Sequence, residues 1–158
     1  MEKIKMAIIG AGIWGETHAS IYKEHMLADV VAICDKDEVK AQNLAKKFGI
    51  TEVYTDYNEL LRNSDCDAVA IVTPDHLHAD IAVACANAKR HMLIEKPLAT
   101  TREDVYRMVE AIERNGVRAM VDLHNRWSPP FNTAKQEVAS GRIGKPVSAY
   151  YRLNDIKW

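Results

Sequence analysis

The chain has 158 residues, of which 47% are hydrophobic and 27% are charged, and its formal net charge is −1. A chain of this size and composition forms a globular fold with its own core, and its near-neutral charge without a basic cluster argues against nucleic acid as a partner. No apolar run approaches the roughly 18 residues of a membrane span. We therefore expect a cytoplasmic protein with no signal peptide and no membrane partner.

The first predicted elements form a unit of strand, turn, helix and strand. An apolar run over residues 4–9 predicts a strand, and it leads into Gly10-Ala11-Gly12-Ile13-Trp14-Gly15 and then a predicted helix. A second apolar run, over residues 30–34, ends on Asp35, twenty residues after Gly15. Strand, glycine turn, helix, strand and acid together make the fingerprint of dinucleotide binding.

Each glycine of this turn has its own physical role. Gly10 permits backbone angles that a side chain forbids. Gly12 lets a pyrophosphate approach the main chain, and Gly15 lets the helix pack closely against the strand. The N–H groups near Ile13 and Trp14 then face the anion at the positive end of the helix. A plain strand-to-helix turn, or a site for S-adenosylmethionine, is the alternative.

The acid at the end of the second strand predicts which dinucleotide binds. Asp35 can accept hydrogen bonds from both ribose hydroxyls and would repel a 2′-phosphate, so we expect NAD rather than NADP. Lys36 follows directly and could tolerate that phosphate. NADP therefore stays open as the less favoured cofactor.

Helices and strands alternate along the middle of the chain. Helices are predicted over residues 37–48, 56–62, 76–88 and from the capping box Thr100-x-x-Glu103 to Asn115, and strands over residues 68–72, 91–94 and 118–121. The apolar strand over 68–72 lacks alternation, as a strand covered on both faces does. This pattern predicts an α/β fold with a doubly wound parallel Rossmann sheet and ligands at the carboxyl ends of the strands.

The pattern changes from about Leu123. A helix is predicted over residues 131–140, and residues 147–153 alternate apolar and polar like a strand of an antiparallel or mixed sheet. We therefore expect an NAD(P)-binding domain over 1–122, and over 123–158 the first helix and strand of a truncated α/β substrate and oligomerisation domain. Without a sheet to cover it, the strand over 147–153 is expected to be disordered, to fold back on the first domain or to pair with another chain, including its own copy.

A second candidate site follows the strand predicted over residues 91–94. Glu95-Lys96-Pro97 stands at its carboxyl end, where the reactive end of a dinucleotide would lie. A lysine beside a carboxylate in a partly desolvated cavity can donate or accept a proton. An ion pair on a surface loop is the alternative.

The remaining histidines and the cysteines give weaker signals. His18 and His25 lie on the first predicted helix and are expected to be surface or packing residues. The pair His76-x-His78 lacks further ligands, so no metal site is expected. The three scattered cysteines predict reduced core thiols.

Five motifs stand at intervals along the chain: Gly10 to Gly15, Thr73-Pro74-Asp75-x-x-His78, Glu95-Lys96-Pro97-Leu98-Ala99, Asn125-Arg126-Trp127 and Ser140-Gly141-Arg142-Ile143-Gly144-Lys145-Pro146. Their combination resembles the Gfo/Idh/MocA family, the group of glucose–fructose oxidoreductase and inositol dehydrogenase. The resemblance implies a nicotinamide-dependent oxidoreductase that acts on a sugar, a polyol or a related alcohol carbon.

The resemblance also implies roles for single residues. By it, Lys96 is a catalytic-site residue that hydrogen-bonds the substrate, and Glu95 lies by the nicotinamide side of the cofactor. The Lys96–Pro97 bond is expected to be cis. By the same likeness, three residues line the cofactor cleft, namely Thr73, Pro74 and His78. Two more, Asn125 and Arg126, lead into the second domain and touch cofactor or substrate.

Members of this family continue beyond the length of this chain with a domain that completes the catalytic group. A partner chain that supplies the missing domain is therefore one expectation. A nucleotide-binding module without catalysis, or an assembly partner, is the alternative function.

Overall fold

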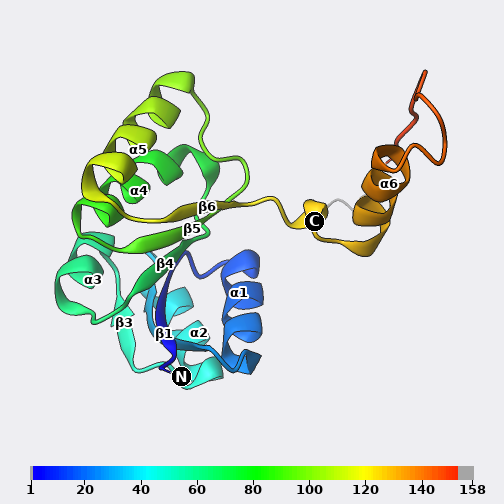
Figure 1. Ribbon diagram of the computed structural model, residues 1–158. Coiled ribbons are helices and arrows are strands. Elements are labelled where there is room, and N and C mark those ends of the chain that lie inside the picture. The colour runs from blue at the N-terminus through cyan, green and yellow to red at the C-terminus, as the bar shows by residue number, and fades with distance from the viewer. Residues whose placement is uncertain (1, 153–158) are drawn as a thin grey trace. The chain divides into compact units, whose positions relative to one another are not determined.

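The structure is a computed structural model that describes residues 2–152, and the chain divides into two compact units, residues 1–122 and 123–158. Figure 1 shows the elements of both units. Within the described residues, no helix is both long enough and apolar enough to cross a membrane.

A six-stranded parallel sheet forms the centre of the first unit, in the order β3-β2-β1-β4-β5-β6. The strands are β1 (Ile4–Ile9), β2 (Ala28–Cys34), β3 (Glu52–Tyr54), β4 (Ala68–Ile71), β5 (His91–Glu95) and β6 (Ala119–Asp122). The strand order reverses between β1 and β4, which is the point where doubly wound sheets bind ligands. The predicted Rossmann fold is confirmed. The three-residue β3 is too short to give a pattern in the sequence.

Helices cover both faces of this sheet (Figure 1). They are α1 (Ile13–Glu24), α2 (Glu38–Phe48), α3 (Tyr57–Asn63), α4 (His78–Asn87) and α5 (Arg102–Asn115). Alternate residues of β1 point to opposite faces, so Ile8 packs in the cluster of α1 and α2, and Ile9 packs in the cluster of α3, α4 and α5. Packing on both faces of the sheet thereby holds the carboxyl ends of the strands at one edge of the first unit.

The start of α5 differs by one residue from the sequence prediction. Thr101, not Thr100, caps the helix: its hydroxyl oxygen accepts from the Asp104 main-chain nitrogen at 3.1 Å. The hydroxyl donates in turn to the Asp104 carboxylate at 2.8 Å. Asp104 therefore takes the place expected of Glu103, because two adjacent threonines both fit the capping pattern and the sequence alone does not choose between them.

The start of α4 also differs. The prediction had one helix from residue 76, whereas a 3₁₀ turn, Asp75–Leu77, precedes α4. This turn brings the chain from β4 into α4 and leaves His78 at the first position of the helix.

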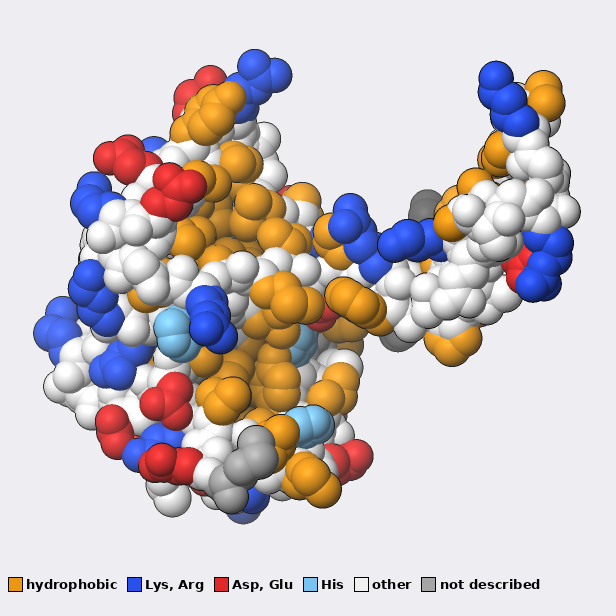
Figure 2. All heavy atoms as spheres, in the orientation of Figure 1, with side chains coloured by type: hydrophobic (Ala, Val, Ile, Leu, Met, Phe, Trp, Pro, Cys, Tyr) orange, Lys and Arg blue, Asp and Glu red, His pale blue; other side chains and the backbone are white. Residues whose placement is uncertain are grey.

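Large hydrophobic side chains are exposed on the α1 side of the first unit. Met120 of β6 is 50% exposed and Ile21 of α1 is 57% exposed. Figure 2 shows hydrophobic side chains gathered on the visible face of this unit. Patches of this kind commonly mark a surface that another element or partner covers.

The second unit contains the 3₁₀ turn His124–Arg126 and the helix α6 (Pro129–Ala139). Residues 147–152 form no strand, so the strand predicted over 147–153 is wrong for these residues, and Leu153 lies outside the described residues. Alternation specifies a face but supplies no partner strand. The ring of Tyr151 instead lies 5.7 Å from the ring of Phe131 on α6, and Val147 is 97% exposed.

Candidate functional site

A cleft of about 640 Å³ opens where the strand order reverses. Its walls include the glycine loop after β1, the end of β2 and the turn after β4. Of the residues that the sequence singles out, the cleft is lined by Gly10, Gly12, Asp35, Lys36, Thr73 and Pro74. Three of the elements that the sequence predicted for the cofactor site therefore meet in one cavity.

The glycines of the loop differ in what their missing side chains allow. Gly10 has a φ of +114°, and a Cβ there would lie 2.7 Å from the carbonyl oxygen of Val72. A Cβ on Gly15 would overlap the Gly10 carbonyl oxygen. A Cβ on Gly12 would meet nothing within 4 Å. Gly10 and Gly15 are thus required by the loop itself, whereas Gly12 leaves open space beside the main chain.

Asp35 fixes the glycine loop to the end of β2. Its Oδ2 accepts a hydrogen bond of 2.7 Å from the Ala11 main-chain nitrogen, and its Oδ1 accepts one of 2.9 Å from that of Asp37. A carboxylate oxygen has two lone pairs, so each oxygen can accept a further bond. The residue can therefore hold the loop and accept from a ribose hydroxyl together.

The turn after β4 carries an unpaired polar atom. Thr73 lines the cleft, and its Oγ1 is buried without a hydrogen-bond partner. Buried hydroxyl groups are nearly always hydrogen-bonded in proteins. Among the described residues it shares this state only with Ser64 Oγ and Arg90 Nε, neither of which lines the cleft. A polar atom of a bound ligand would satisfy it.

His78 lies between two turns rather than on the cleft wall. It is 1% exposed, and its ring nitrogens lie 2.9 Å from the carbonyl oxygens of Thr73 and Pro97. The side chain therefore lies between the turn after β4 and the turn after β5, with one carbonyl oxygen of each turn at a ring nitrogen.

The turn after β5 brings Lys96 to the glycine loop. The Lys96–Pro97 peptide bond is cis, which confirms the sequence prediction. Lys96 is exposed, whereas Glu95 is 5% exposed. The Lys96 ammonium lies 5.9 Å from the centre of the Trp14 ring, within the range of a cation–π interaction.

His18 belongs to this site, although the sequence reasoning expected a surface or packing residue. It is 6% exposed, and its Nε2 lies 3.1 Å from Glu95 Oε1 and 3.8 Å from Asp122 Oδ2. Its Nδ1 lies 3.0 Å from the hydroxyl of Tyr22. Burial, followed by the charges of Asp122 and Glu95, raises the pKa of the Tyr22 hydroxyl. The spacing Gly15, His18, Tyr22, with intervals of three and four residues, was the available signal for one buried helix face.

The three side chains His18, Glu95 and Asp122 also offer ligand atoms within 4.8 Å of one another. Imidazole and carboxylate groups suit several divalent metals. His18 and Glu95 already form a hydrogen bond, from the ring N–H to the carboxylate, so their short distance does not require a metal ion.

The other residues that the sequence singled out for binding do not line the cleft themselves. Ile13 is 69% exposed and Trp14 is 48% exposed, both at the first turn of α1. Asn125 and Arg126 lie in the second unit, in the 3₁₀ turn, and both are exposed. All three cysteines are free and buried, which confirms their expected place in the core.

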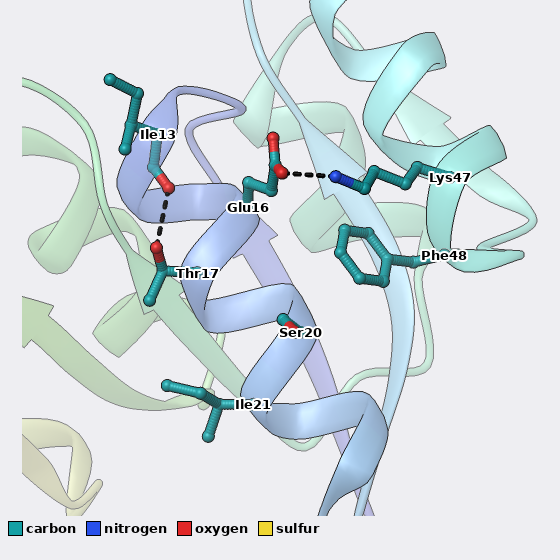
Figure 3. Close-up of a pocket in the computed structure, with 7 residues that line it drawn as sticks. All are labelled: Ile13, Glu16, Thr17, Ser20, Ile21, Lys47 and Phe48. Atoms are coloured by element: carbon teal, nitrogen blue, oxygen red, sulfur yellow. Dashed lines mark hydrogen bonds and ion pairs between the residues drawn. The ribbon is translucent and has the colours of Figure 1, made fainter.

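A second hollow, of about 580 Å³, lies between α1 and α2 (Figure 3). Glu16 and Lys47 form an ion pair there, and Phe48 points toward the same space. Of the residues that the sequence singled out for binding, only Ile13 lines this hollow. The glycine loop, Asp35 and the unpaired hydroxyl of Thr73 instead belong to the cleft.

Comparison with known proteins gives relatives for the whole first unit. Residues 4–123 match the GFO_IDH_MocA model, described as an oxidoreductase family with an NAD-binding Rossmann fold. Myo-inositol 2-dehydrogenase from Thermotoga maritima is 33% identical over 143 residues, which cover 90% of this chain and 43% of that protein. Inositol 2-dehydrogenase from Salmonella typhimurium is 34% identical over 152 residues, which cover 94% of this chain and 45% of that protein.

Solved structures give the same result. Scyllo-inositol dehydrogenase from Lactobacillus casei, with NAD(H) and scyllo-inositol bound, matches with a TM-score of 0.86 and 27% identity, over 90% of this chain and 43% of that one. The WlbA dehydrogenase from Bordetella pertussis, in complex with NADH and UDP-GlcNAcA, matches with a TM-score of 0.86 and 31% identity, over 90% and 44%. The chain spans less than half the length of each of these relatives. Family match, identity and fold agree, and the chain belongs to the Gfo/Idh/MocA family of oxidoreductases.

Proposed function

We propose that this chain is the NAD-binding part of a dehydrogenase that moves a hydride between nicotinamide and an alcohol carbon of a sugar or polyol. The observation that carries the proposal is the cleft at the strand-order reversal, which combines open space at Gly12, the acid Asp35 and the unpaired hydroxyl of Thr73. Membership of an NAD-binding family supports the cofactor. The names of the inositol dehydrogenases among its relatives support the substrate class.

The residues of the cleft fit a dinucleotide by their chemistry. Helix α1 has no side-chain cap at Gly12, so its N-terminus is open to the pyrophosphate beside Ile13 and Trp14. Asp35 would accept from the ribose hydroxyls, and Thr73 would pair its free hydroxyl with the cofactor while Pro74 shapes the same wall. His78 would act by holding Thr73 in place.

Lys96 is the residue we propose for the catalytic site. Its ammonium would hold the substrate hydroxyl by a hydrogen bond, and Glu95 would lie on the nicotinamide side. The bound cofactor supplies hydride transfer, and Lys96 fixes where the alcohol oxygen lies. Asn125 and Arg126 are proposed to contact substrate or cofactor from the second domain, which in this proposal begins at residue 123.

Cofactor binding can be tested on the chain itself. The sequence has three tryptophans, so Trp127→Phe with Trp158→Phe leaves Trp14 as the only one. We expect NADH to quench Trp14 emission and to raise nicotinamide emission saturably, because energy passes from the ring in the glycine loop to the cofactor. Thr73→Val should weaken this binding, and Ser64→Ala, which removes a buried unpaired hydroxyl away from the cleft, should not.

Turnover separates an enzyme from a binding module. NAD⁺ is mixed with a panel of inositols and sugars, and the absorbance of reduced nicotinamide is followed for the chain and for Lys96→Met. Reduction that depends on Lys96 supports the dehydrogenase. Saturable binding without reduction of NAD⁺ by any polyol favours a nucleotide-binding module or the need for a partner chain, whereas no binding of NADH overturns the proposal.

A further inference from the structure

Two carboxylates lie side by side at the ends of β5 and β6. Glu95 and Asp122 are register partners in the parallel pair, and the alternation along each strand turns both toward α1. Met92 and Ile94 face the opposite cluster, so Glu95, which follows Ile94, faces the α1 side. Like charges directly opposite on neighbouring strands repel, so this pairing needs a compensating group.

His18 is that group. It enters from the buried face of α1, and its Nε2 donates to Glu95 Oε1 at 3.1 Å, because a carboxylate oxygen can only accept. The same nitrogen lies 3.8 Å from Asp122 Oδ2. One ring nitrogen therefore faces both carboxylates, and the hydroxyl of Tyr22 at 3.0 Å from Nδ1 holds the other side of the ring.

The second oxygen of Glu95 points in a different direction. Glu95 Oε2 accepts from the main-chain nitrogen of Lys96 at 3.1 Å. With Oε1 held by His18, the carboxylate cannot rotate without losing one of its two bonds. The orientation of the Lys96 main chain is thus set from α1, through Glu95.

We infer that His18 is a positioning residue for Lys96. It fixes Glu95, Glu95 fixes the Lys96 main chain, and the Lys96 ammonium is directed toward the ring of Trp14 in the glycine loop. Because α1 begins within that loop, one helix carries both the loop that receives the cofactor and the histidine that orients the catalytic turn. The functional meaning of this arrangement rests on the proposed role of Lys96.

The test compares three variants by amide NMR and adds Lys96→Met for Trp14 fluorescence, in the background with Trp14 as the only tryptophan. His18→Leu removes the donor to Glu95. His18→Gln can replace it, because a glutamine side chain places its amide near the position of Nε2. Tyr22→Phe is the matched control, since it removes a contact of the same ring but leaves the bond to Glu95.

We expect the Lys96 amide proton, which is deshielded by the carboxylate, to move upfield by more than its linewidth in His18→Leu. Its position should be restored in His18→Gln and kept in Tyr22→Phe. Lys96→Met should change the emission of Trp14 when His18 is present and should have no further effect in His18→Leu. If His18→Leu acted only by loosening the fold, His18→Gln would not restore the Lys96 amide. Lys96→Met would then still change the emission of Trp14 in His18→Leu.

Two results would overturn the inference: an unmoved Lys96 amide in folded His18→Leu, or an effect of Lys96→Met on Trp14 that is the same with and without His18. Should His18→Leu not fold by circular dichroism, His18→Met replaces it. A methionine side chain has no N–H to donate to Glu95, so the same upfield movement of Lys96 is expected and its absence is contrary evidence. None of these measurements needs cofactor, so a failure of NADH binding tests the proposed function separately.

Discussion

The carboxylate of Asp35, at the end of β2, accepts a hydrogen bond of 2.7 Å from the main-chain nitrogen of Ala11 in the glycine loop. The residue that is proposed to select the cofactor thus also holds the loop that is proposed to receive its pyrophosphate. A substitution at this position changes two properties, and the choice of side chain separates them.

Asp35→Asn keeps an oxygen for the Ala11 nitrogen but removes the negative charge. We expect it to lose NADH affinity and to gain NADPH affinity relative to the parent chain, because a 2′-phosphate is no longer repelled. Hydrogen bonds to charged groups contribute about 1.5–3 kcal/mol, so the ratio of the two affinities should change by tenfold or more. Fluorescence titration with both reduced cofactors measures it.

Asp35→Ala removes the acceptors of both the Ala11 and the Asp37 nitrogens as well as the charge, and it should lower the melting temperature more than Asp35→Asn, which keeps one acceptor oxygen. Lys36→Ala is the control for the alternative that a lysine accepts the phosphate. If the parent chain binds NADPH as tightly as NADH and Lys36→Ala abolishes that binding, the assignment to Asp35 is wrong.

Two glycine substitutions should affect different properties: Gly15→Ala should lower stability, and Gly12→Ala should weaken NADH binding. Gly15→Ala places a Cβ against the Gly10 carbonyl oxygen and should destabilise the fold by about 1–3 kcal/mol, the usual cost of overpacking. Gly12→Ala has open space and should unfold at the same urea concentration as the parent, but it should weaken NADH binding because its methyl group fills the space beside the main chain. Urea titration and NADH titration of both variants check this, and equal stability of the two would contradict it.

The two carbonyl oxygens that face His78 predict its contribution to stability. His78→Leu removes the buried ring whose nitrogens face the carbonyls of Thr73 and Pro97, and it should cost about 1–3 kcal/mol, the usual cost of an unsatisfied group. The loss should appear in urea unfolding and should be accompanied by weaker NADH binding, since Thr73 lines the cleft. His76→Leu, at an exposed neighbour, should stay within about 0.5 kcal/mol. Similar losses in both variants would show that the two carbonyl contacts are not the cause.

What the sequence predicts well here is local. The glycine turn, the acid twenty residues later and the helix α2 are set by neighbours along the chain, and the fold that they imply is the one found. His18 was predicted to be a surface or packing residue and is buried, but its contact with Glu95 was not predicted, because Glu95 is 77 residues away and is placed by the register of β5 and β6.

The segment 147–152 shows the converse case. Its alternation is a true local pattern, yet a strand also needs a partner, and none of the described residues supplies one. The contact of Tyr151 with Phe131 could not be predicted, because a single ring contact leaves no period in a sequence.

The buried thiols predict how stability depends on alkaline pH. Burial, followed by the charges of Asp35, Asp56 and Glu59, raises the pKa of the Cys34 thiol to about 12, and burial also raises the pKa of Cys66 and of Cys85. An unfolded cysteine ionises near pH 8.5, so the unfolded chain releases these protons first. The stabilising effect of the neutral thiols is therefore complete below about pH 8.5 and is lost progressively as the pH rises toward 12.

We expect the free energy of unfolding in urea to fall between pH 8.5 and 10.5. Cys34→Ala should make this fall with pH less steep, whatever its effect on the free energy of unfolding at pH 7. A slope that is the same in parent and variant would show that Cys34 is not protected from ionisation in the folded chain.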